Sequence, residues 1–364
     1  MSAPVHTPTR LELPYPAIWL RDNCPCPSCQ DPRNGQKLFG ITDLADDLSV
    51  VAVERDDDRV VITFDDGHRS EFDLTWLAAQ RPGRDGGDGR TEQDKQLWTA
   101  QDLAGKLPES EWSAYTSDRH ERLRVLRAVQ SLGFAVLHGT PVEDRTVLRI
   151  AETFGHIRVT NYGELFDVRV ETDPNNLAFT GLAISPHTDN PYRDPVPTLQ
   201  LLHCLSNAVD GGESGLVDGF MAASRLRVDD PGAFGILTST PVPFAWSDGT
   251  ASLVAERPLI DVDGRGRIRE VRFNNRSMRP VRLPYDDVDA FYRAYRRFAE
   301  IVRHPDLLLT FRLETGDCVL FDNVRLLHAR TAFSNTVEGQ RHLQGCYADL
   351  DGLQSTIAVL SGAA

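Results

Sequence analysis

Three cysteines within six residues place the strongest constraint on how this chain can fold. Cys24, Cys26 and Cys29 lie in the run Cys-Pro-Cys-Pro-Ser-Cys, whose two prolines stiffen the turn. Thiolates at this spacing can converge on one cation, and a tetrahedral structural zinc site then needs a fourth ligand. His68 is the natural candidate, because it follows an Asp-Gly turn from which a hairpin can return it to the cysteines.

The alternative is three unconnected thiols, but a C-x-C-x-x-C cluster is rare by chance, so we predict structural zinc. Four protein ligands leave no open coordination position, and this site is therefore not expected to be catalytic. The remaining cysteines, Cys204, Cys318 and Cys346, lie in apolar surroundings and are predicted to be buried small hydrophobic residues.

Length and charge limit the classes of protein that this chain can represent. Its 364 residues fit two or three domains, and its 41% hydrophobic and 25% charged residues are typical of a globular protein. The net charge of −14 argues against nucleic-acid binding. The sequence has no run of 18 apolar residues and no evident signal peptide at its start, so we predict a cytoplasmic protein without a membrane partner.

The N-terminal part is predicted to form a small β domain over residues 1–80. Valine-rich runs alternate around charged turns and predict short strands, over residues 48–54, 59–64 and 71–74. Residues 81–111 are rich in glycine and charge and show no apolar period, so we predict a linker. A larger domain then covers residues 112–364.

The larger domain is predicted to be α+β, built on a β-sandwich or jelly roll. Apolar spacing predicts helices over residues 120–132 and 286–303. Another helix is expected to begin at Thr140, where the Thr-Pro-Val-Glu sequence matches a capping box. Short β-like runs such as TLQLLHC, LLLTFRL and CVLFD fill the rest, which indicates a strand-rich core with a few helices beside it.

His187 and Asp189 form a His-x-Asp pair, which means little alone, since about 1.5 histidine–acid pairs of this spacing are expected by chance. A second such pair, His304 with Asp306, follows a predicted helix, where the helix dipole explains a histidine. His187 and Asp189 lie instead in a loop rich in proline and asparagine, and a strand-like run far downstream ends on His328.

These three residues have the chemistry of a non-haem iron site. Two imidazoles and one carboxylate on one face of an iron ion leave three positions open for a chelating cosubstrate and dioxygen. Arg341, thirteen residues beyond His328, offers the planar, bidentate partner that the distal carboxylate of a dicarboxylate needs.

The chain resembles the γ-butyrobetaine dioxygenase and trimethyllysine dioxygenase family of Fe(II)/2-oxoglutarate oxygenases, within the wider taurine-dioxygenase-like group. The resemblance covers nearly the whole chain and is carried by WLRDNCPCPSC, DDGHRSEF, NNLAFT, HTDNPY, LQLLHC, GGESGLVDGF, FDNVRLLHAR and RHLQGCYADLDG. It implies a double-stranded β-helix (jelly-roll) catalytic domain and an N-terminal module that binds zinc through three cysteines and a histidine. It also implies a homodimer.

The resemblance assigns roles residue by residue. His187, Asp189 and His328 would bind Fe(II), and Arg341 would bind 2-oxoglutarate, assisted by the backbone near Leu202. The implied reaction oxidises a C–H bond of the substrate while 2-oxoglutarate and O₂ yield succinate and CO₂, with ascorbate as reductant.

The resemblance also implies an aromatic cage for a trimethylammonium group, since aromatic faces attract a cation that cannot donate hydrogen bonds. The matching positions are Tyr162, Phe166, Phe179 and Tyr347. Two of them depart from the family pattern, which has Trp at 166 and Tyr at 179. Any one of these rings could simply pack in the core, but the set of four favours a cage.

Asparagines are the implied partners of the acidic end of the substrate. They are Asn176 and Asn274, or Asn275 in place of the latter. Arg276 adds a positive charge that either reaches this anion or lies solvated at the surface.

The predicted function is oxidation of a small trimethylammonium acid, most simply γ-butyrobetaine to L-carnitine. The alternative keeps this chemistry on trimethyllysine or on a trimethylammonium phosphonate or betaine of secondary metabolism, with desaturation or rearrangement in place of hydroxylation. A third hypothesis, a zinc-stabilised binding protein without turnover, is disfavoured by the intact His187, Asp189, His328 and Arg341.

Overall fold

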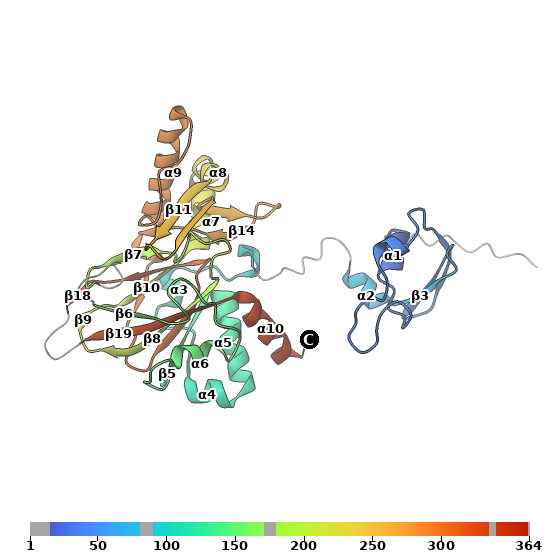
Figure 1. Cartoon of the computed structure of the whole chain (residues 1–364), viewed down its shortest axis with the longest axis horizontal. Coiled ribbons are helices and arrows are strands. Elements are labelled where there is room, and N and C mark those ends of the chain that lie inside the picture. The colour runs from blue at the N-terminus through green and yellow to red at the C-terminus, as the bar shows by residue number, and fades with distance from the viewer. Residues whose placement is uncertain (1–14, 81–89, 171–179, 335–339, 363–364) are drawn as a thin grey trace, which may run out of the picture. The chain divides into compact units, whose positions relative to one another are not determined.

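The computed structural model describes residues 15–80, 90–170, 180–334 and 340–362 (Figure 1). The chain divides into two compact units, Met1–Gly86 and Gly87–Ala364, and each is described by itself.

The first unit is a three-stranded antiparallel sheet with two short helices. The strands are β1 (Val50–Arg55), β2 (Arg59–Phe64) and β3 (Arg69–Asp73), and the helices are α1 (Ala17–Asp22) and α2 (Leu74–Ala79). Alternate residues of β2 are buried, as expected for a sheet with one covered face. The core is small and consists of Leu20, Val60, Ile62, Phe64, Phe72 and Leu77. The three predicted strands are confirmed within two residues.

The second unit contains two facing sheets. The larger sheet has the order β4 (Glu109–Glu111), β5 (Phe134–His138), β16 (Cys318–Asp322), β8 (Leu199–Asn207), β19 (Arg341–Ala348) and β6 (Phe166–Arg169). The smaller sheet has the order β15 (Leu309–Phe311), β10 (Ser214–Asp218), β17 (Leu326–Arg330) and β7 (Ile184–His187). One apolar cluster joins them, with Phe134, Val319 and Phe321 from the larger sheet and Leu216 and Leu326 from the smaller. This arrangement is a jelly roll, as predicted.

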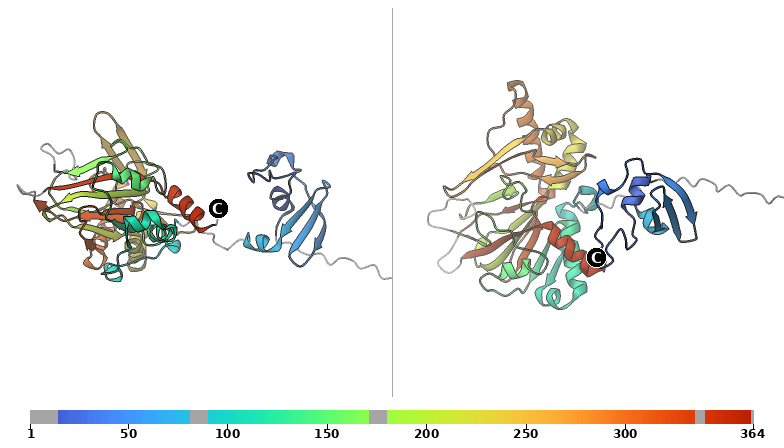
Figure 2. Two further views of the ribbon diagram at one scale, coloured as in Figure 1. Left: turned by 90° about the horizontal axis from the view of Figure 1, so that it is seen from below. Right: turned by 45° about the vertical axis from the view of Figure 1, so that its right-hand side comes forward.

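Helices cover this core at two places, and the views agree on both (Figures 1 and 2). One group packs on the outer face of the larger sheet and consists of α4 (Trp112–Ser117), α5 (Arg119–Leu132), α6 (Thr146–Ala151) and α10 (Leu350–Ser361). The other group is α7 (Gly219–Asp229), α8 (Pro231–Ser239) and α9 (Tyr285–Val302). It packs with two hairpins, β11 (Val242–Ser247) with β12 (Ser252–Arg257) and β13 (Ile260–Val262) with β14 (Ile268–Val271).

Two sequence predictions about these elements are wrong. The helix expected at Thr140 begins only at Thr146, because the Thr140 amide and hydroxyl both donate to the carbonyl of Gly316 and hold the chain away from a helical path. The predicted linker ends too late, because residues from Thr91 onward pack into the second unit. Trp98 is fully buried there.

The predicted helices at 120–132 and 286–303 are confirmed as α5 and α9. Among the described residues, no helix is long and apolar enough to span a membrane.

Candidate active site

The two histidines of the predicted iron site are neighbours across a pair of antiparallel strands. His187 ends β7 and lies directly opposite His328 of β17, with ring centroids 4.1 Å apart. Asp189 follows on the loop. Its Oδ1 is 3.3 Å from His187 Nε2, and its Oδ2 is 3.7 Å from His328 Nε2. Residues 141 positions apart in sequence thus present three ligand atoms within 4.8 Å of one another.

The protein holds Asp189 by both its backbone and its carboxylate. The buried amide of Asn323 accepts from the Asp189 N–H at 2.8 Å and donates to the Asp189 carbonyl at 3.0 Å. Gln200 and Tyr347 each donate to Oδ2 at 3.0 Å. Sequence analysis missed Asn323 and Gln200 as supports, although Asn323 lies within the FDNVRLLHAR motif.

Hydrogen bonding and charge prepare the three side chains for a cation. Nδ1–H of His187 donates to the carbonyl of Ser185 at 2.9 Å, which leaves the Nε2 lone pair free for a metal. Burial, with His187 beside it, lowers the pKa of His328 to about 3, so this imidazole is neutral. Burial raises the pKa of Asp189, but the two imidazoles and Arg276 outweigh it and hold the pKa well below its usual range. Two imidazoles and a carboxylate fit Fe(II).

A cavity of about 480 Å³ opens on these ligands. Arg341 lines it and is only 3% exposed, yet its Nε and Nη1 have no hydrogen-bond partner among the described residues. Burial lowers the pKa of Arg341 to about 10, so the guanidinium stays charged at neutral pH. A buried, charged guanidinium with two N–H groups that lack hydrogen-bond partners can bind a carboxylate. Leu202 lines the same cavity.

Aromatic side chains line the cavity beside the iron ligands. Tyr162, Phe166 and Tyr347 are among them, as predicted. The rings of Phe166 and Tyr347 lie 5.1 Å apart, and those of Tyr162 and Phe166 lie 6.3 Å apart. Asn176 and Phe179 lie outside the described residues. Tyr192 and Trp246 also line the cavity, and sequence analysis missed both.

The residues expected at the acidic end of the substrate differ in their surroundings. Asn274 lines the cavity, but its side chain donates to the Thr188 carbonyl at 2.9 Å and accepts from the Arg276 N–H at 3.1 Å. Asn275 accepts from the hydroxyl of Tyr295 at 3.0 Å and does not line the cavity. Arg276 is exposed and does line it.

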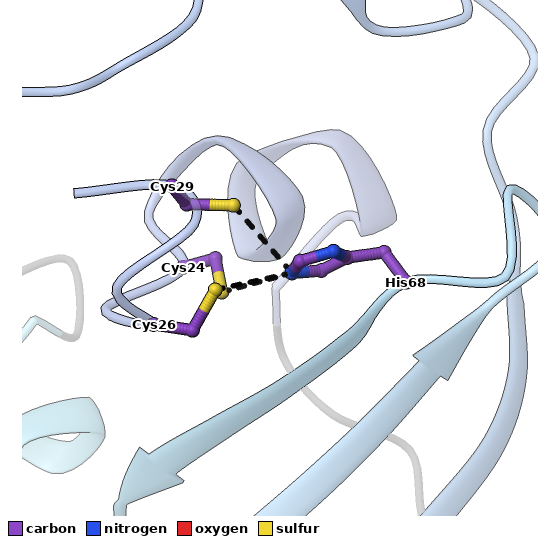
Figure 3. Close-up of side chains that lie close together, drawn as sticks. All are labelled: Cys24, Cys26, Cys29 and His68. Atoms are coloured by element: carbon purple, nitrogen blue, oxygen red, sulfur yellow. Dashed lines mark hydrogen bonds between the residues drawn. The ribbon is translucent and has the colours of Figure 1, made fainter.

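In the first unit, the three cysteines and His68 come together as predicted (Figure 3). His68 Nε2 is 3.2, 3.6 and 3.5 Å from the sulfurs of Cys24, Cys26 and Cys29. Zn–S and Zn–N bonds of ~2.3 and ~2.05 Å in a tetrahedron would separate the sulfur and nitrogen by about 3.5 Å. Burial raises the pKa of Cys24 to about 11, so a cation is needed to keep this thiol ionised.

Comparison with known proteins agrees with this geometry. Residues 96–347 match the taurine catabolism dioxygenase TauD, TfdA family, and residues 6–78 match the gamma-butyrobetaine hydroxylase-like N-terminal family. The chain is 39% identical to gamma-butyrobetaine dioxygenase of Pseudomonas sp. (strain AK-1), over 95% of this chain and 90% of the relative. It is 32% identical to the Homo sapiens gamma-butyrobetaine dioxygenase, over 95% and 91%. It is 30% identical to the trimethyllysine dioxygenase of Meyerozyma guilliermondii, over 94% and 90%.

The fold, the site and these matches define an iron- and 2-oxoglutarate-dependent dioxygenase. Within that class, the chain belongs to the TauD, TfdA family, on the branch that contains the gamma-butyrobetaine and trimethyllysine dioxygenases. The family and enzyme class predicted from the sequence are confirmed.

Proposed function

We propose that this protein hydroxylates γ-butyrobetaine to L-carnitine. The observation that carries the proposal is a single cavity that unites the His187–Asp189–His328 triad, the unpartnered Arg341 guanidinium and a wall of aromatic rings. The 39% identity to a protein named gamma-butyrobetaine dioxygenase supports the same substrate.

The residues have distinct parts in this reaction. His187, Asp189 and His328 would hold Fe(II), which together with 2-oxoglutarate and O₂ would supply the oxidising power for C–H cleavage. Arg341 binds the distal carboxylate of 2-oxoglutarate through paired N–H donors, and the backbone near Leu202, which lines the same cavity, assists. The rings of Tyr162, Phe166 and Tyr347 attract the trimethylammonium group and exclude water. The chain thereby fixes which C–H bond faces the oxidant.

The acidic end of the substrate is assigned to the side of the cavity that carries Arg276. Two hydrogen bonds already occupy the Asn274 amide, which leaves only its second N–H for a ligand, whereas Arg276 brings a full positive charge to the same cavity. Asn176 stays a predicted partner from the family resemblance.

The test is succinate formation with Fe(II), 2-oxoglutarate and ascorbate, in the presence of γ-butyrobetaine, trimethyllysine, a trimethylammonium phosphonate or no substrate. Succinate that depends on γ-butyrobetaine, with carnitine as product, is the expected result. Equal succinate with and without γ-butyrobetaine would reject this substrate.

A second candidate is the same chemistry on another quaternary ammonium compound. The charge of Arg276 favours it, since an added cation suits a substrate with a more strongly charged acidic end. Phenylalanine at 166 also favours it, since this ring attracts a cation less strongly than tryptophan does. In the same assay, the phosphonate or trimethyllysine would then give the highest turnover. Mass spectrometry of the product separates hydroxylation, a gain of one oxygen atom, from desaturation, a loss of two hydrogen atoms, and from rearrangement.

We also propose that Cys24, Cys26, Cys29 and His68 bind structural zinc. The sulfur–nitrogen distances and the raised pKa of Cys24 support this assignment. Metal analysis of protein purified without chelator should find about one zinc per chain, and protein without zinc would reject the site.

Homodimer formation and a cytoplasmic location are proposed from the family resemblance and the sequence. Light scattering of the purified protein tests the first, with a mass near 81 kDa expected from two chains of 40.5 kDa each. Fractionation of the source cells tests the second.

A further inference from the structure

Trp246 is an aromatic side chain that the predicted cage does not include. It lies on β11, in a hairpin far in sequence from the other cage positions, and it lines the cavity that contains the iron ligands. Its ring centroid is 5.5 Å from that of Tyr162 and 6.0 Å from that of Tyr192.

Tyr192 links Trp246 to the predicted cage. Its ring is stacked on Trp246, with 21° between the planes, and its hydroxyl is 3.1 Å from the hydroxyl of Tyr162. Tyr192 is only 6% exposed and lines the same cavity. Tyr162 is therefore a neighbour of both Phe166 and the Tyr192–Trp246 pair.

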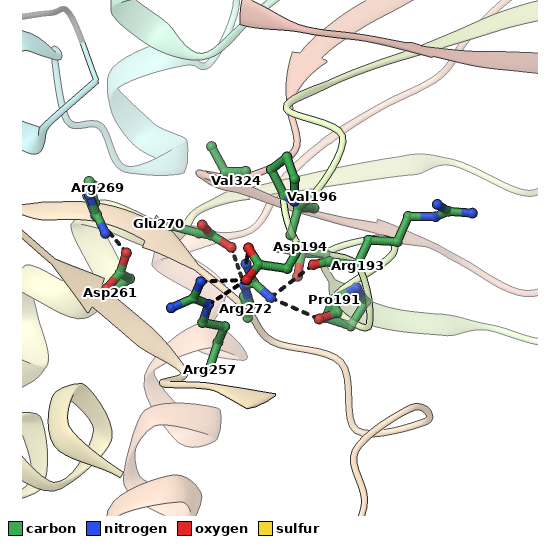
Figure 4. Close-up of polar contacts among 12 residues, drawn as sticks. Pro191, Arg193, Asp194, Val196, Arg257, Asp261, Arg269, Glu270, Arg272 and Val324 are labelled. Carbon is green, nitrogen blue, oxygen red and sulfur yellow. Dashed lines mark hydrogen bonds and ion pairs between the residues drawn. The ribbon is translucent and has the colours of Figure 1, made fainter. Parts of the chain in front are cut away.

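A buried guanidinium fixes the loop that carries Tyr192 (Figure 4). Arg272 Nη1 donates to the carbonyls of Pro191 and Arg193, the residues on either side of Tyr192, at 3.1 Å each. Its Nε donates to the half-buried carboxylate of Glu270, and Asp194 lies 3.8 Å from its Nη2. The Tyr192 ring is thus placed before any ligand binds, which lowers the entropy lost on binding.

Few negative charges line the cavity, so a cationic ligand would be recognised mainly by aromatic faces. Asp189 is the sole carboxylate among the described lining residues, and its charge is committed to the metal. Tryptophan has the aromatic face that binds cations most strongly, and Trp246 is the one tryptophan among the described residues that line the cavity, whereas position 166 carries phenylalanine.

We propose that Trp246, backed by Tyr192, is a specificity-determining wall of the cation cage and supplies the indole face that position 166 lacks. The proposal rests on the proposed function, the oxidation of a trimethylammonium substrate. It adds that the Trp246 ring selects for the positive charge of that substrate. Trp246 contacts the quaternary ammonium group, and Tyr192 and Arg272 act through Trp246 as positioning residues.

The test compares γ-butyrobetaine with its uncharged isostere, 5,5-dimethylhexanoate, in which carbon replaces nitrogen. Binding of each is measured by calorimetry to the enzyme loaded with Fe(II) and 2-oxoglutarate without oxygen, so that nothing turns over. Trp246→Leu should weaken γ-butyrobetaine binding about tenfold and isostere binding less than threefold, because only the former loses a cation–π contact. Trp246→Phe should lie between wild type and Trp246→Leu.

Trp112→Phe is the matched control. Trp112 is half-buried on α4, packs on Tyr115 and does not line the cavity, so its loss should leave the affinities for both ligands unchanged. Unchanged 2-oxoglutarate affinity in Trp246→Leu and Trp246→Phe establishes that these variants are folded with an intact iron site.

Three results would overturn the proposal. Unchanged γ-butyrobetaine affinity in Trp246→Leu, while the wild type still makes carnitine, removes Trp246 from the cage and leaves the proposed function standing. An equal loss for both ligands shows that Trp246 contributes only apolar contact. A wild-type enzyme that binds no trimethylammonium compound rejects the proposed function and this proposal together.

Discussion

At the scale of single residues, the site depends on neighbouring groups that hold the three candidate metal ligands in place. Asn323 fixes the backbone of Asp189, and the Ser185 carbonyl selects the tautomer of His187. Neither contact has a periodic signature: Asn323 reaches Asp189 only through the tertiary fold, and the Ser185 contact depends on the orientation of one side chain. The grouping of His187, Asp189 and His328 could be predicted, since metal-ligand chemistry is specific to residue type, whereas the residues that support them could not.

The unpartnered state of Arg341 predicts a selective defect. Arg341→Ala should raise the KM for 2-oxoglutarate at least thirtyfold, because loss of one partner of a buried charge pair costs roughly 2–5 kcal/mol. Steady-state kinetics with varied 2-oxoglutarate measures it. Arg341→Lys, which keeps the charge but loses the fork, should show a smaller increase. A KM for 2-oxoglutarate that stays at the wild-type value in Arg341→Ala would contradict the assignment.

Gly345 predicts a defect of the opposite selectivity. It lies opposite Phe166 in the pairing of β19 with β6, and a methyl group at Gly345 would overlap the Phe166 ring. Gly345→Ala should therefore displace this ring and raise the KM for the substrate several-fold, while the KM for 2-oxoglutarate stays within twofold. Gly264→Ala is the control, because a methyl group there meets open space. An unaltered substrate KM in Gly345→Ala would show that the Phe166 ring does not contribute to substrate binding.

At the scale of elements, the spacing of apolar residues predicted helices, whose hydrogen bonds are local. It did not predict segments that are held in place by tertiary contacts. The helix α9 has a strong amphipathic pattern, so its bounds were predicted within one residue. The segment before Glu111 has no such pattern, yet Trp98 is buried there. Its backbone N–H donates to the Asp218 carboxylate at 3.2 Å. The composition of this segment resembles that of a linker, although the buried ring of Trp98 and the buried ion pair of Asp218 with Arg325 hold it in place.

That ion pair gives a prediction for stability. Asp218 and Arg325 are both fully buried, with Oδ2 and Nη2 2.7 Å apart, and Asp218 also caps α7. Asp218→Asn should lower the free energy of unfolding of the second unit by roughly 3–5 kcal/mol, since it leaves a buried charge unpaired. Asp229→Asn on the same helix is the control. Its exposed partner Arg297 is 3.6 Å away, and such pairs contribute about 0–1 kcal/mol. Urea unfolding that gives equal losses for the two variants would contradict this account.

At the scale of the whole molecule, the two units differ in what stabilises them. Among the described residues, the second unit contains three large apolar clusters, whereas the first contains one small cluster of six buried residues. So small a core rarely suffices without a metal or disulfide. The first unit is therefore expected to depend on its metal, as the cysteine spacing in the sequence already indicated.

Zinc removal should consequently unfold one unit and spare the other. A strong chelator is expected to abolish the ordered environment of Trp19 and Trp76, which pack together in the first unit. Fluorescence and calorimetry should then show loss of one transition, while the second unit retains its helical circular dichroism. Cys24→Ser should reproduce this loss without chelator, and Cys204→Ser, in the second unit, should not. Calorimetric transitions that stay unchanged after complete zinc removal would contradict the prediction.

The pairing of β7 with β17 has a consequence for how such enzymes diversify. Because His187 and His328 meet through strand register, a hairpin outside the two sheets, such as β11–β12, can change in length or sequence without moving either imidazole. Trp246 lies on that hairpin, and Arg276 also lies between the two histidines in sequence. Part of the substrate wall is thus carried by residues that do not belong to the His187–Asp189–His328 triad, so substitutions there can alter the substrate while the triad stays in place.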